Sequence, residues 1–213
     1  MLGGSDGTIE GLAMTSALNG AGLGFGTIAL AGLAFAVAGA ISMFFSYYLS
    51  RKSGLESLKI DMARERMEIE TEPEEERQEM VELLKGDGYE DSEVEVIMRR
   101  LSKDKDLWLR EMLRRELKID AGEAGSSNYS GAVAAGVSFL LLASLAVSPY
   151  VFVVSRAGAL GISVSASLVA LFALGSRAFV RGNFRPKAGL ESAAVGALAA
   201  ALLYLAGVAL SNL

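Results

Sequence analysis

Acidic residues crowd the stretch ERMEIETEPEEERQEM at spacings that suit metal binding. It contains two Glu-x-x-Glu pairs, one on each side of Pro73: Glu65 with Glu68, and Glu76 with Glu79. On one unbroken helix all four side chains share a face, but Glu65 and Glu76 are about 16 Å apart along its axis. Because proline ends or kinks a helix, a turn at Pro73 lets the pairs face each other across two packed helices. Inward-facing carboxylate pairs form an oxygen-rich pocket in helical bundles, so the pattern predicts a metal site.

A thioether and a further carboxylate follow later in the chain. Met112 and Glu116 form an i, i+4 pair on one face of a predicted helix, whereas Glu111 points about 100° away. A thioether beside carboxylates is a softer ligand set, which favours Fe²⁺ or Mn²⁺ over Mg²⁺ or Ca²⁺. The plainer interpretation is that the glutamates form solvated helix faces and that Met112 packs in a core.

Two more acids, Asp6 and Glu10, lie one helical turn apart at the start of the first apolar segment. Ionisable residues within a membrane are costly and mark functional sites by default. The alternative is that both lie at the level of the lipid headgroups as charges at a helix end. Met43, in the next apolar segment, either faces lipid or lines a path for a soft divalent ion.

Charge is largely confined to one part of the chain. Residues 51–123 carry 22 of the 25 acidic and 15 of the 20 basic residues, a local net charge of −7, in a chain that is 52% hydrophobic. This segregation indicates membrane segments joined to one acidic, water-facing insert. The chain has no Cys and no His, which excludes disulfides, thiolate metal sites and imidazole ligands. A metal must therefore be held by oxygen ligands, amides or methionine.

The apolar segments predict an all-α integral membrane protein with five transmembrane helices and a cytosolic helical insert between the second and the third. A spanning helix needs about 20 mostly apolar residues. We expect such helices at residues 6–23, 25–48, 131–154, 157–176 and 188–211. The first is the most polar, so we expect it to be buried among the others. The domains are then residues 1–50 with two helices, 51–123 as the metal-binding insert, and 124–213 with three helices.

Turn and capping signals divide the insert into four helices. The second membrane helix is expected to continue to about residue 72, and further helices are expected at about 74–85, 93–102 and 105–119. Ser92-x-x-Glu95 is typical of a capping box that opens the third of these helices. In the membrane part, glycines recur four apart, a spacing that allows close helix contacts and that also arises by chance: Gly7 with Gly11, Gly20 with Gly24, and Gly22 with Gly26.

The distribution of basic residues predicts the orientation. The insert carries most of them, and the short loop 177–187 holds four more: Arg177, Arg181, Arg185 and Lys187. Cytosolic loops carry an excess of Lys and Arg, so the N-terminus and the insert are expected in the cytosol and the C-terminus outside or in a lumen. The first residues, MLGGSDGTIEG, lack the basic start of a signal peptide, so we expect a retained helix.

Several of these motifs occur together in one known family. SDGTIEG followed by TSALNGAGL, residues 5–23, resembles the first helix of the vacuolar iron transporter family, and AGLAFAVAGAISMFFSYYLSRKS, residues 31–53, resembles its second. The insert is similar as well, with a long second helix, two Glu-x-x-Glu pairs around a proline and a later Met-x-x-x-Glu. The resemblance implies a homodimer of five-helix subunits that exports Fe²⁺, or Mn²⁺, from the cytosol in exchange for H⁺.

The resemblance also implies roles for single residues. Asp6 and Met43 would line the translocation path with Glu10 nearby, and a cytosolic metal site would be formed by Glu65, Glu68, Glu76, Glu79, Met112 and Glu116. One departure concerns the second helix, where Tyr47 replaces the acid that the family usually has and Ser46 replaces a glycine. Loss of a membrane carboxylate bears on proton coupling and on the choice of ion.

Three other functions fit parts of the pattern. The first is a membrane protein that binds or senses a metal without transporting it. The second is a carboxylate di-iron oxidase, against which the absence of the usual Glu-x-x-His motif weighs. The third is a structural membrane protein with a solvated acidic domain. We expect a transporter and not an enzyme, with divalent metal ions, H⁺, a second copy of the chain and a lipid bilayer as partners, and with no nucleic acid.

Overall fold

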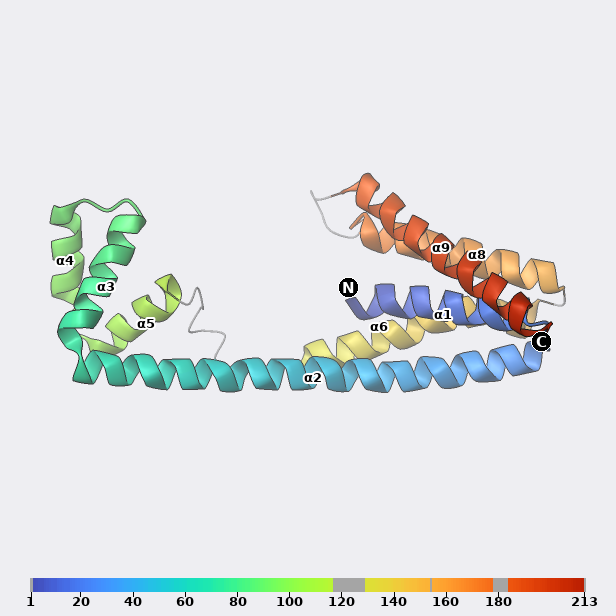
Figure 1. Ribbon diagram of the computed structural model, residues 1–213, viewed down its shortest axis with the longest axis horizontal. Coiled ribbons are helices and arrows are strands. Elements are labelled where there is room, and N and C mark those ends of the chain that lie inside the picture. Colours follow the sequence, from blue (N-terminus) through green and yellow to red (C-terminus); the bar gives the residue numbers. More distant parts are fainter. Residues whose placement is uncertain (1, 117–128, 154, 178–183, 213) are drawn as a thin grey trace. The chain divides into compact units, whose positions relative to one another are not determined.

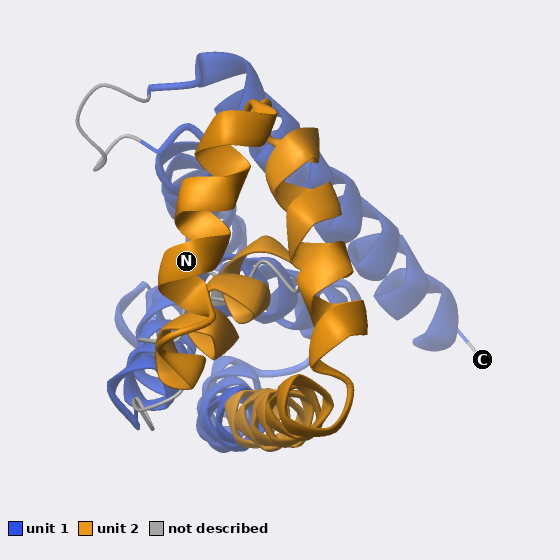
Figure 2. Cartoon of the chain, turned by 90° about the vertical axis from the view of Figure 1, so that its left-hand side faces the viewer, with its two compact units in different colours: residues 1–48, 129–213 blue, residues 49–128 orange. Residues whose placement is uncertain are grey.

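The computed structural model describes residues 2–116, 129–153, 155–177 and 184–212, and every regular element in these ranges is an α-helix (Figure 1). The predicted all-α class is therefore confirmed for the described residues. In chain order the helices are α1 (Leu2–Gly20), α2 (Phe25–Thr71), α3 (Pro73–Gly86), α4 (Asp91–Leu101), α5 (Lys105–Arg115), α6 (Tyr129–Val147), α7 (Pro149–Phe152), α8 (Arg156–Gly175) and α9 (Pro186–Leu210). They belong to two compact units: unit 1 is residues 1–48 with 129–213, and unit 2 is residues 49–128 (Figure 2).

Four helices are long and apolar enough to cross a membrane, namely α2, α6, α8 and α9. In α2 the apolar part is its first half, which belongs to unit 1. The first helix, α1, is not in this group, because polar and acidic residues lower its hydropathy. It packs instead against α6, α8 and α9 within unit 1 (Figure 1), so the sequence prediction of a helix buried among the others is confirmed.

Glycines let α1 approach α6 closely. A Cβ atom added at Gly7 would lie 2.6 Å from the carbonyl oxygen of Phe139, and one added at Gly11 would lie 2.9 Å from the Cα atom of Ala143. Small residues at such positions allow two helix backbones to touch. The predicted role of the Gly7/Gly11 pair is therefore confirmed. In the other two predicted pairs only Gly20 forms such a contact, because a Cβ added there would clash with the backbone carbonyl of Tyr204 in α9. An added Cβ would meet nothing within 4 Å at Gly22, Gly24 or Gly26.

We expect Gly11→Val to destabilise unit 1 by about 1–3 kcal/mol, because the new side chain has to displace the α6 backbone. The measurement is the thermal unfolding midpoint of the full chain in detergent, followed by circular dichroism. Gly161→Val is the matched control, since a Cβ at Gly161 of α8 would meet nothing within 4 Å. Equal midpoints for the two variants would contradict close packing of α1 on α6.

A basic residue at the start of α8 holds the loop after α1. Arg156, the first residue of α8, donates hydrogen bonds to the carbonyl oxygens of Asn19 (3.2 Å), Gly22 (3.1 Å) and Leu23 (2.9 Å). A cation is favourable at the C-terminal end of a helix, where carbonyl groups lack partners. Arg156 therefore fixes the end of α1 against the start of α8.

Two local predictions were wrong. The helix expected at residues 131–154 is interrupted, because Pro149 cannot continue the hydrogen bonding of α6 and begins the short helix α7. The capping box expected at Ser92 lies two residues earlier: Glu90 is the N-cap of α4, and its amide donates to Glu93 Oε2 at 2.9 Å. Of the helix expected at 105–119, α5 ends at Arg115, and residues 117–119 lie outside the described ranges.

Unit 2 has its own hydrophobic core, to which all four of its helices contribute. The second half of α2 ends at Thr71 and α3 begins at Pro73, the residue that was predicted to end the helix. The buried core residues are Ile69 of α2, Met80 and Leu84 of α3, Val94, Met98 and Leu101 of α4, and Trp108, Leu109, Met112 and Leu113 of α5. Burial of these side chains fixes the rotation of α2, α3 and α5, and hence the directions of their polar faces.

Candidate metal-capture site

The corner at Pro73 brings the acidic faces of three helices of unit 2 together. Glu65 and Glu68 lie on α2, and Glu76 and Glu79 lie on α3. Glu116 is the C-cap residue that directly follows α5. Glu65 is only 2% exposed and Glu76 only 7% exposed, although carboxylates are seldom buried without a partner. Met112, one turn before Glu116, is completely buried in the core. The acids of this site are called the capture cluster below.

The carboxylates of the capture cluster act on one another electrostatically. Burial, followed by the negative charges of Glu65, Glu79, Glu68 and Glu116, raises the pKa of Glu76 to about 7. Burial also raises the pKa of Glu65, with Glu116 and Glu68 as further causes. The pKa of Glu116 is raised by burial and then by Glu79. Since like charges raise a carboxyl pKa only at short range, the three helices do bring these groups close together.

Two buried oxygens of the cluster have no hydrogen-bond partner. They are Oε2 of Glu65 and Oε2 of Glu76. A buried polar atom without a partner is costly, and a cation is the ligand that would satisfy both oxygens and relieve the repulsion. Within the described residues, no three acidic side chains are yet grouped tightly enough to hold one ion. The donor set therefore fits a divalent cation by charge and chemistry, and binding requires side-chain rotation.

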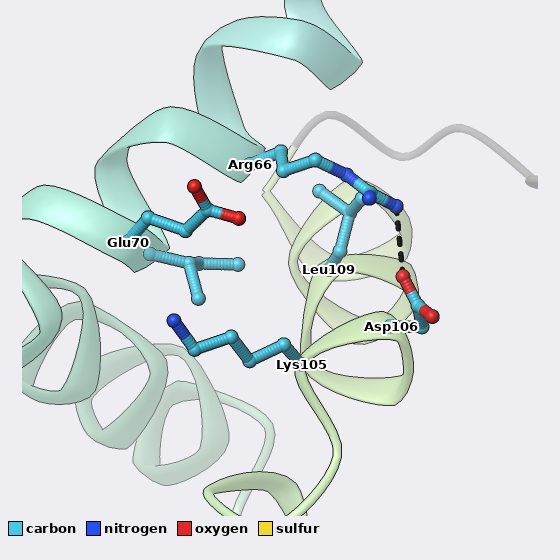
Figure 3. A pocket seen from close by; sticks show the side chains of 6 residues that line it. Arg66, Glu70, Lys105, Asp106 and Leu109 are labelled. Atoms are coloured by element: carbon cyan, nitrogen blue, oxygen red, sulfur yellow. Dashed lines mark hydrogen bonds and ion pairs between the residues drawn. The ribbon is translucent and has the colours of Figure 1, made fainter.

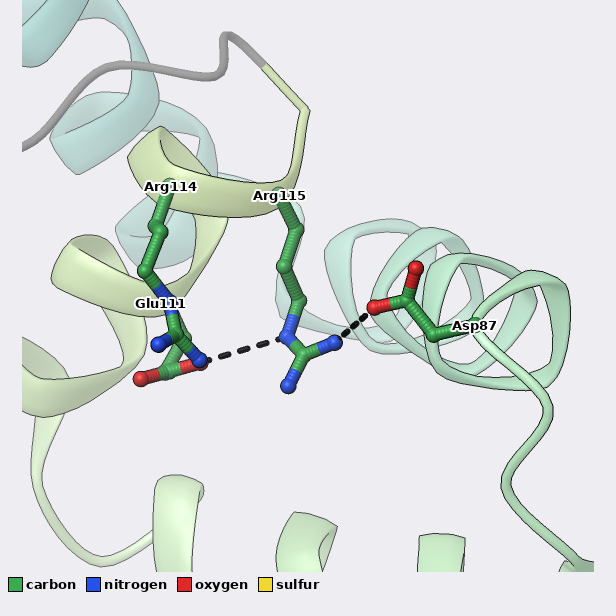
Figure 4. Close-up of polar contacts among 4 residues, drawn as sticks. All are labelled: Asp87, Glu111, Arg114 and Arg115. Carbon is green, nitrogen blue, oxygen red and sulfur yellow. Dashed lines mark hydrogen bonds and ion pairs between the residues drawn. The ribbon is translucent and has the colours of Figure 1, made fainter. Parts of the chain in front are cut away.

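An arginine beside the cluster is tied into a separate network. Arg115 of α5 forms ion pairs with Glu111 on its own helix and with Asp87 in the turn after α3, and Arg114 pairs with the same Glu111 (Figure 4). The guanidinium also lies 5.5 Å from the ring centroid of Tyr89. Arg115 therefore fastens the end of α5, where Glu116 lies, to the turn between α3 and α4.

We expect Arg115→Ala to destabilise unit 2 by about 1–3 kcal/mol, because it removes a guanidinium that is only 12% exposed and that joins Glu111 to Asp87. Arg114→Ala is the matched control; its side chain is 60% exposed, so a change below about 1 kcal/mol is expected. Chemical unfolding of the full chain in detergent, followed by fluorescence of the single tryptophan, Trp108 in the core of unit 2, measures both. An equal effect of the two variants would contradict the fastening role of Arg115.

The predicted membrane residues lie in unit 1. Asp6 of α1 is half-buried and Glu10 is exposed, and neither carboxylate forms a hydrogen bond or ion pair with another described side chain. Met43 of α2 is half-buried and packs on the apolar cluster of Ala36, Phe139 and Ala143. An ionisable side chain at such a position is a candidate functional residue.

Comparison with known proteins identifies the family. A sequence profile of the VIT family matches residues 1–208. The chain belongs to the VIT family. The resemblance inferred from the motifs is thus confirmed. Similar members of the VIT family include a vacuolar iron transporter of Centaurea cyanus, 31% identical over 205 residues, which are 96% of this chain and 83% of the relative.

Two further relatives of this VIT-family chain come from rice and thale cress. Vacuolar iron transporter 1 of Oryza sativa subsp. japonica is 32% identical over 208 residues, covering 96% of this chain and 81% of the relative. Vacuolar iron transporter 1 of Arabidopsis thaliana is 31% identical over 208 residues, covering 96% of this chain and 82% of the relative. The profile match covers all of unit 2 and all of unit 1 except residues 209–213.

Tyr47 of α2, where the resemblance implied an acid, contacts α6 in this VIT-family chain. Gly131 of α6 has no side chain, and a Cβ added there would clash with the phenol ring of Tyr47. The neighbouring ring of Tyr48 stacks between Phe44 and Tyr129. Tyr47 therefore packs α2 against α6 and offers a neutral hydroxyl at this position.

Proposed function

We propose that this VIT-family chain is a secondary transporter that moves Fe²⁺ out of the cytosol in exchange for H⁺. The observation that carries the proposal is the capture cluster, in which two buried carboxylates present unpartnered oxygens among repelling neighbours. The relatives named as vacuolar iron transporters support iron as the ion. Mn²⁺ is the alternative ion, since the proposed ligand set of carboxylates and a thioether suits both.

We further propose how the chain is arranged around the membrane. The helix α1 joins α2, α6, α8 and α9 as a fifth membrane helix, and it tolerates its polar residues because it packs among them. The domains are residues 1–50 and 124–213 in the membrane and residues 51–123 as the metal-binding domain. The N-terminus and this domain lie in the cytosol and the C-terminus outside or in a lumen, and two subunits form a homodimer.

The proposed mechanism begins with capture. A divalent ion entering the cluster binds the free oxygens of Glu65 and Glu76, with Glu68, Glu79 and Glu116 as further carboxylates and Met112 as a thioether. Because burial and mutual repulsion raise the pKa of Glu65, Glu76 and Glu116, the ion displaces protons as it binds. Within the membrane, Asp6 binds the ion or its counter-proton, Met43 offers its thioether, and Glu10 lies one turn from Asp6.

The test is Fe²⁺ entry into sealed vesicles that contain the purified full chain, with a metal-quenched dye and a pH dye inside. Dye quenching together with a pH change is expected. Metal binding in detergent without quenching in vesicles would replace this function with binding or sensing. Oxygen consumption on addition of Fe²⁺, without flux, would replace it with oxidase activity.

A further inference from the structure

Another arginine, Arg64, directly contacts two carboxylates of the capture cluster. Arg64 of α2 places Nη2 3.5 Å from Oε1 of Glu65 and Nε 3.6 Å from Oε2 of Glu68. One guanidinium thus spans both carboxylates of the first Glu-x-x-Glu pair. Its charge also acts on Glu116 of α5, whose carboxyl pKa it lowers against the effect of burial.

The contacts of Arg64 are loose. Both distances exceed the roughly 2.7–2.9 Å of a charge-assisted hydrogen bond between a guanidinium and a carboxylate. The side chain is 53% exposed, so rotation into solvent requires no unpacking. On Glu65 the guanidinium covers Oε1 only, because Oε2 is buried and has no partner.

A neighbouring arginine on the same helix shows the contrasting case. Arg66 pairs with Asp106 of α5 at 2.7 Å and lines a shallow pocket with Glu70, Lys105 and Leu109 (Figure 3). Neither Arg66 nor Asp106 is among the main causes of the raised pKa values of Glu65, Glu76 and Glu116. The two arginines have the same charge and similar exposure, and they differ in whether they face the cluster.

We propose that Arg64 is the internal counter-cation of the capture cluster, which a divalent ion must displace in order to bind. The proposal rests on the proposed capture of a divalent ion by unit 2. Arg64 then sets the affinity of the capture cluster for the divalent ion. Its positive charge partly neutralises the carboxylates, and the return of its side chain to the cluster helps to expel the ion.

The chemistry of arginine suits this role. A guanidinium keeps its charge at every physiological pH, so it can leave the cluster only by moving, unlike the protons on the carboxyls. When it has moved, its charge still opposes a divalent ion nearby. At a separation of about 8 Å in a water-like dielectric, that repulsion weakens binding by about sixfold. A transporter has to release its ion as well as capture it, and an internal cation keeps the capture affinity moderate.

The experiment compares Mn²⁺ binding by the full chain in detergent, measured by isothermal titration calorimetry, for the intact chain, Arg64→Gln and Arg66→Gln. We expect Arg64→Gln to bind Mn²⁺ about sixfold more tightly. Arg66→Gln is expected to stay within about twofold of the intact chain, because its exposed ion pair lies away from the cluster. Arg64→Lys keeps the charge and is expected to stay within about threefold.

Unchanged or weaker binding by Arg64→Gln, with normal binding by the intact chain, would overturn the role of Arg64 and leave capture intact. Equal tightening in Arg64→Gln and Arg66→Gln would also overturn it, since the effect would then be one of net charge. Failure of the intact chain to bind Mn²⁺ would instead remove the capture function, and the role of Arg64 with it. Trp108 fluorescence in each variant verifies that unit 2 is folded.

Discussion

Asp6→Asn stops Fe²⁺ entry into vesicles, reducing the flux by at least about a hundredfold, while metal binding by unit 2 stays intact. The substitution keeps the shape of the side chain and removes its charge. Asp6 is half-buried in α1, the least apolar helix of unit 1, and forms no ion pair with another described residue. On the proposed path through this unit, a cation therefore loses a carboxylate that no described side chain already pairs when Asp6 becomes Asn.

The readouts for this variant are dye quenching in vesicles and Mn²⁺ affinity in detergent. Glu10→Gln is the matched control, because Glu10 lies one turn away on the same helix but is exposed, so a smaller loss is expected. Flux by Asp6→Asn at the normal rate, in protein shown to be folded, would remove Asp6 from the path. Loss of both flux and binding would point to misfolding.

Metal affinity of the intact chain falls by about tenfold for each pH unit below about 7 when one proton has to leave for the ion to bind. The group responsible is Glu76, whose pKa is raised to about 7 by burial and by the surrounding carboxylates. Glu76→Gln removes this proton and a ligand together, so binding becomes weaker and less dependent on pH. Titrations of Mn²⁺ at several pH values measure both effects.

Folding stability without metal should change with pH in the opposite direction. Because the pKa of Glu76 is higher in the folded chain than its ordinary value of 4.5, the folded state holds this proton more tightly. Its contribution is fully present below about pH 4.5 and is lost as the pH rises to about 7, on the order of 3 kcal/mol. Glu75→Gln, an exposed neighbour on α3, should leave both pH profiles unchanged. A flat profile in the intact chain would contradict the raised pKa.

Much of unit 2 could be predicted because local rules and packing agree there. The two Glu-x-x-Glu pairs would share one face of a continuous helix, and Pro73 must interrupt that helix. The spacing alone therefore predicts that the pair on α2 faces the pair on α3. The burial of Glu65 and Glu76 could not be predicted, since it depends on how the core residues rotate α2 and α3. The sequence contains one hint of Arg64, its position four residues before Glu68, but such pairs are usually solvated.

The errors in unit 1 and in α4 arose where a single backbone feature decided the structure. Pro149 lies in a continuous apolar run, so hydropathy predicted one helix where the missing amide ends it. In α4 the sequence pattern at Ser92 predicted the start, whereas the structure places the N-cap at Glu90, whose backbone amide binds the side chain of Glu93. The bonds of Arg156 to the loop after α1 join residues more than 130 positions apart, which no local pattern predicts.

Because the chain turns a corner at Pro73, the number of residues between the glutamates on either side matters more for the geometry of the capture cluster than the identity of those residues. Glu65 and Glu76 are eleven residues apart, as are Glu68 and Glu79, and the corner lies between both pairs. One residue inserted after Pro73 would rotate α3 by about 100°, carrying its two glutamates away from α2 together with the core residue Met80. Substitutions there alter one contact, whereas an insertion or deletion puts the whole helix out of register. A reporter peptide or labelling tag therefore belongs elsewhere in the chain.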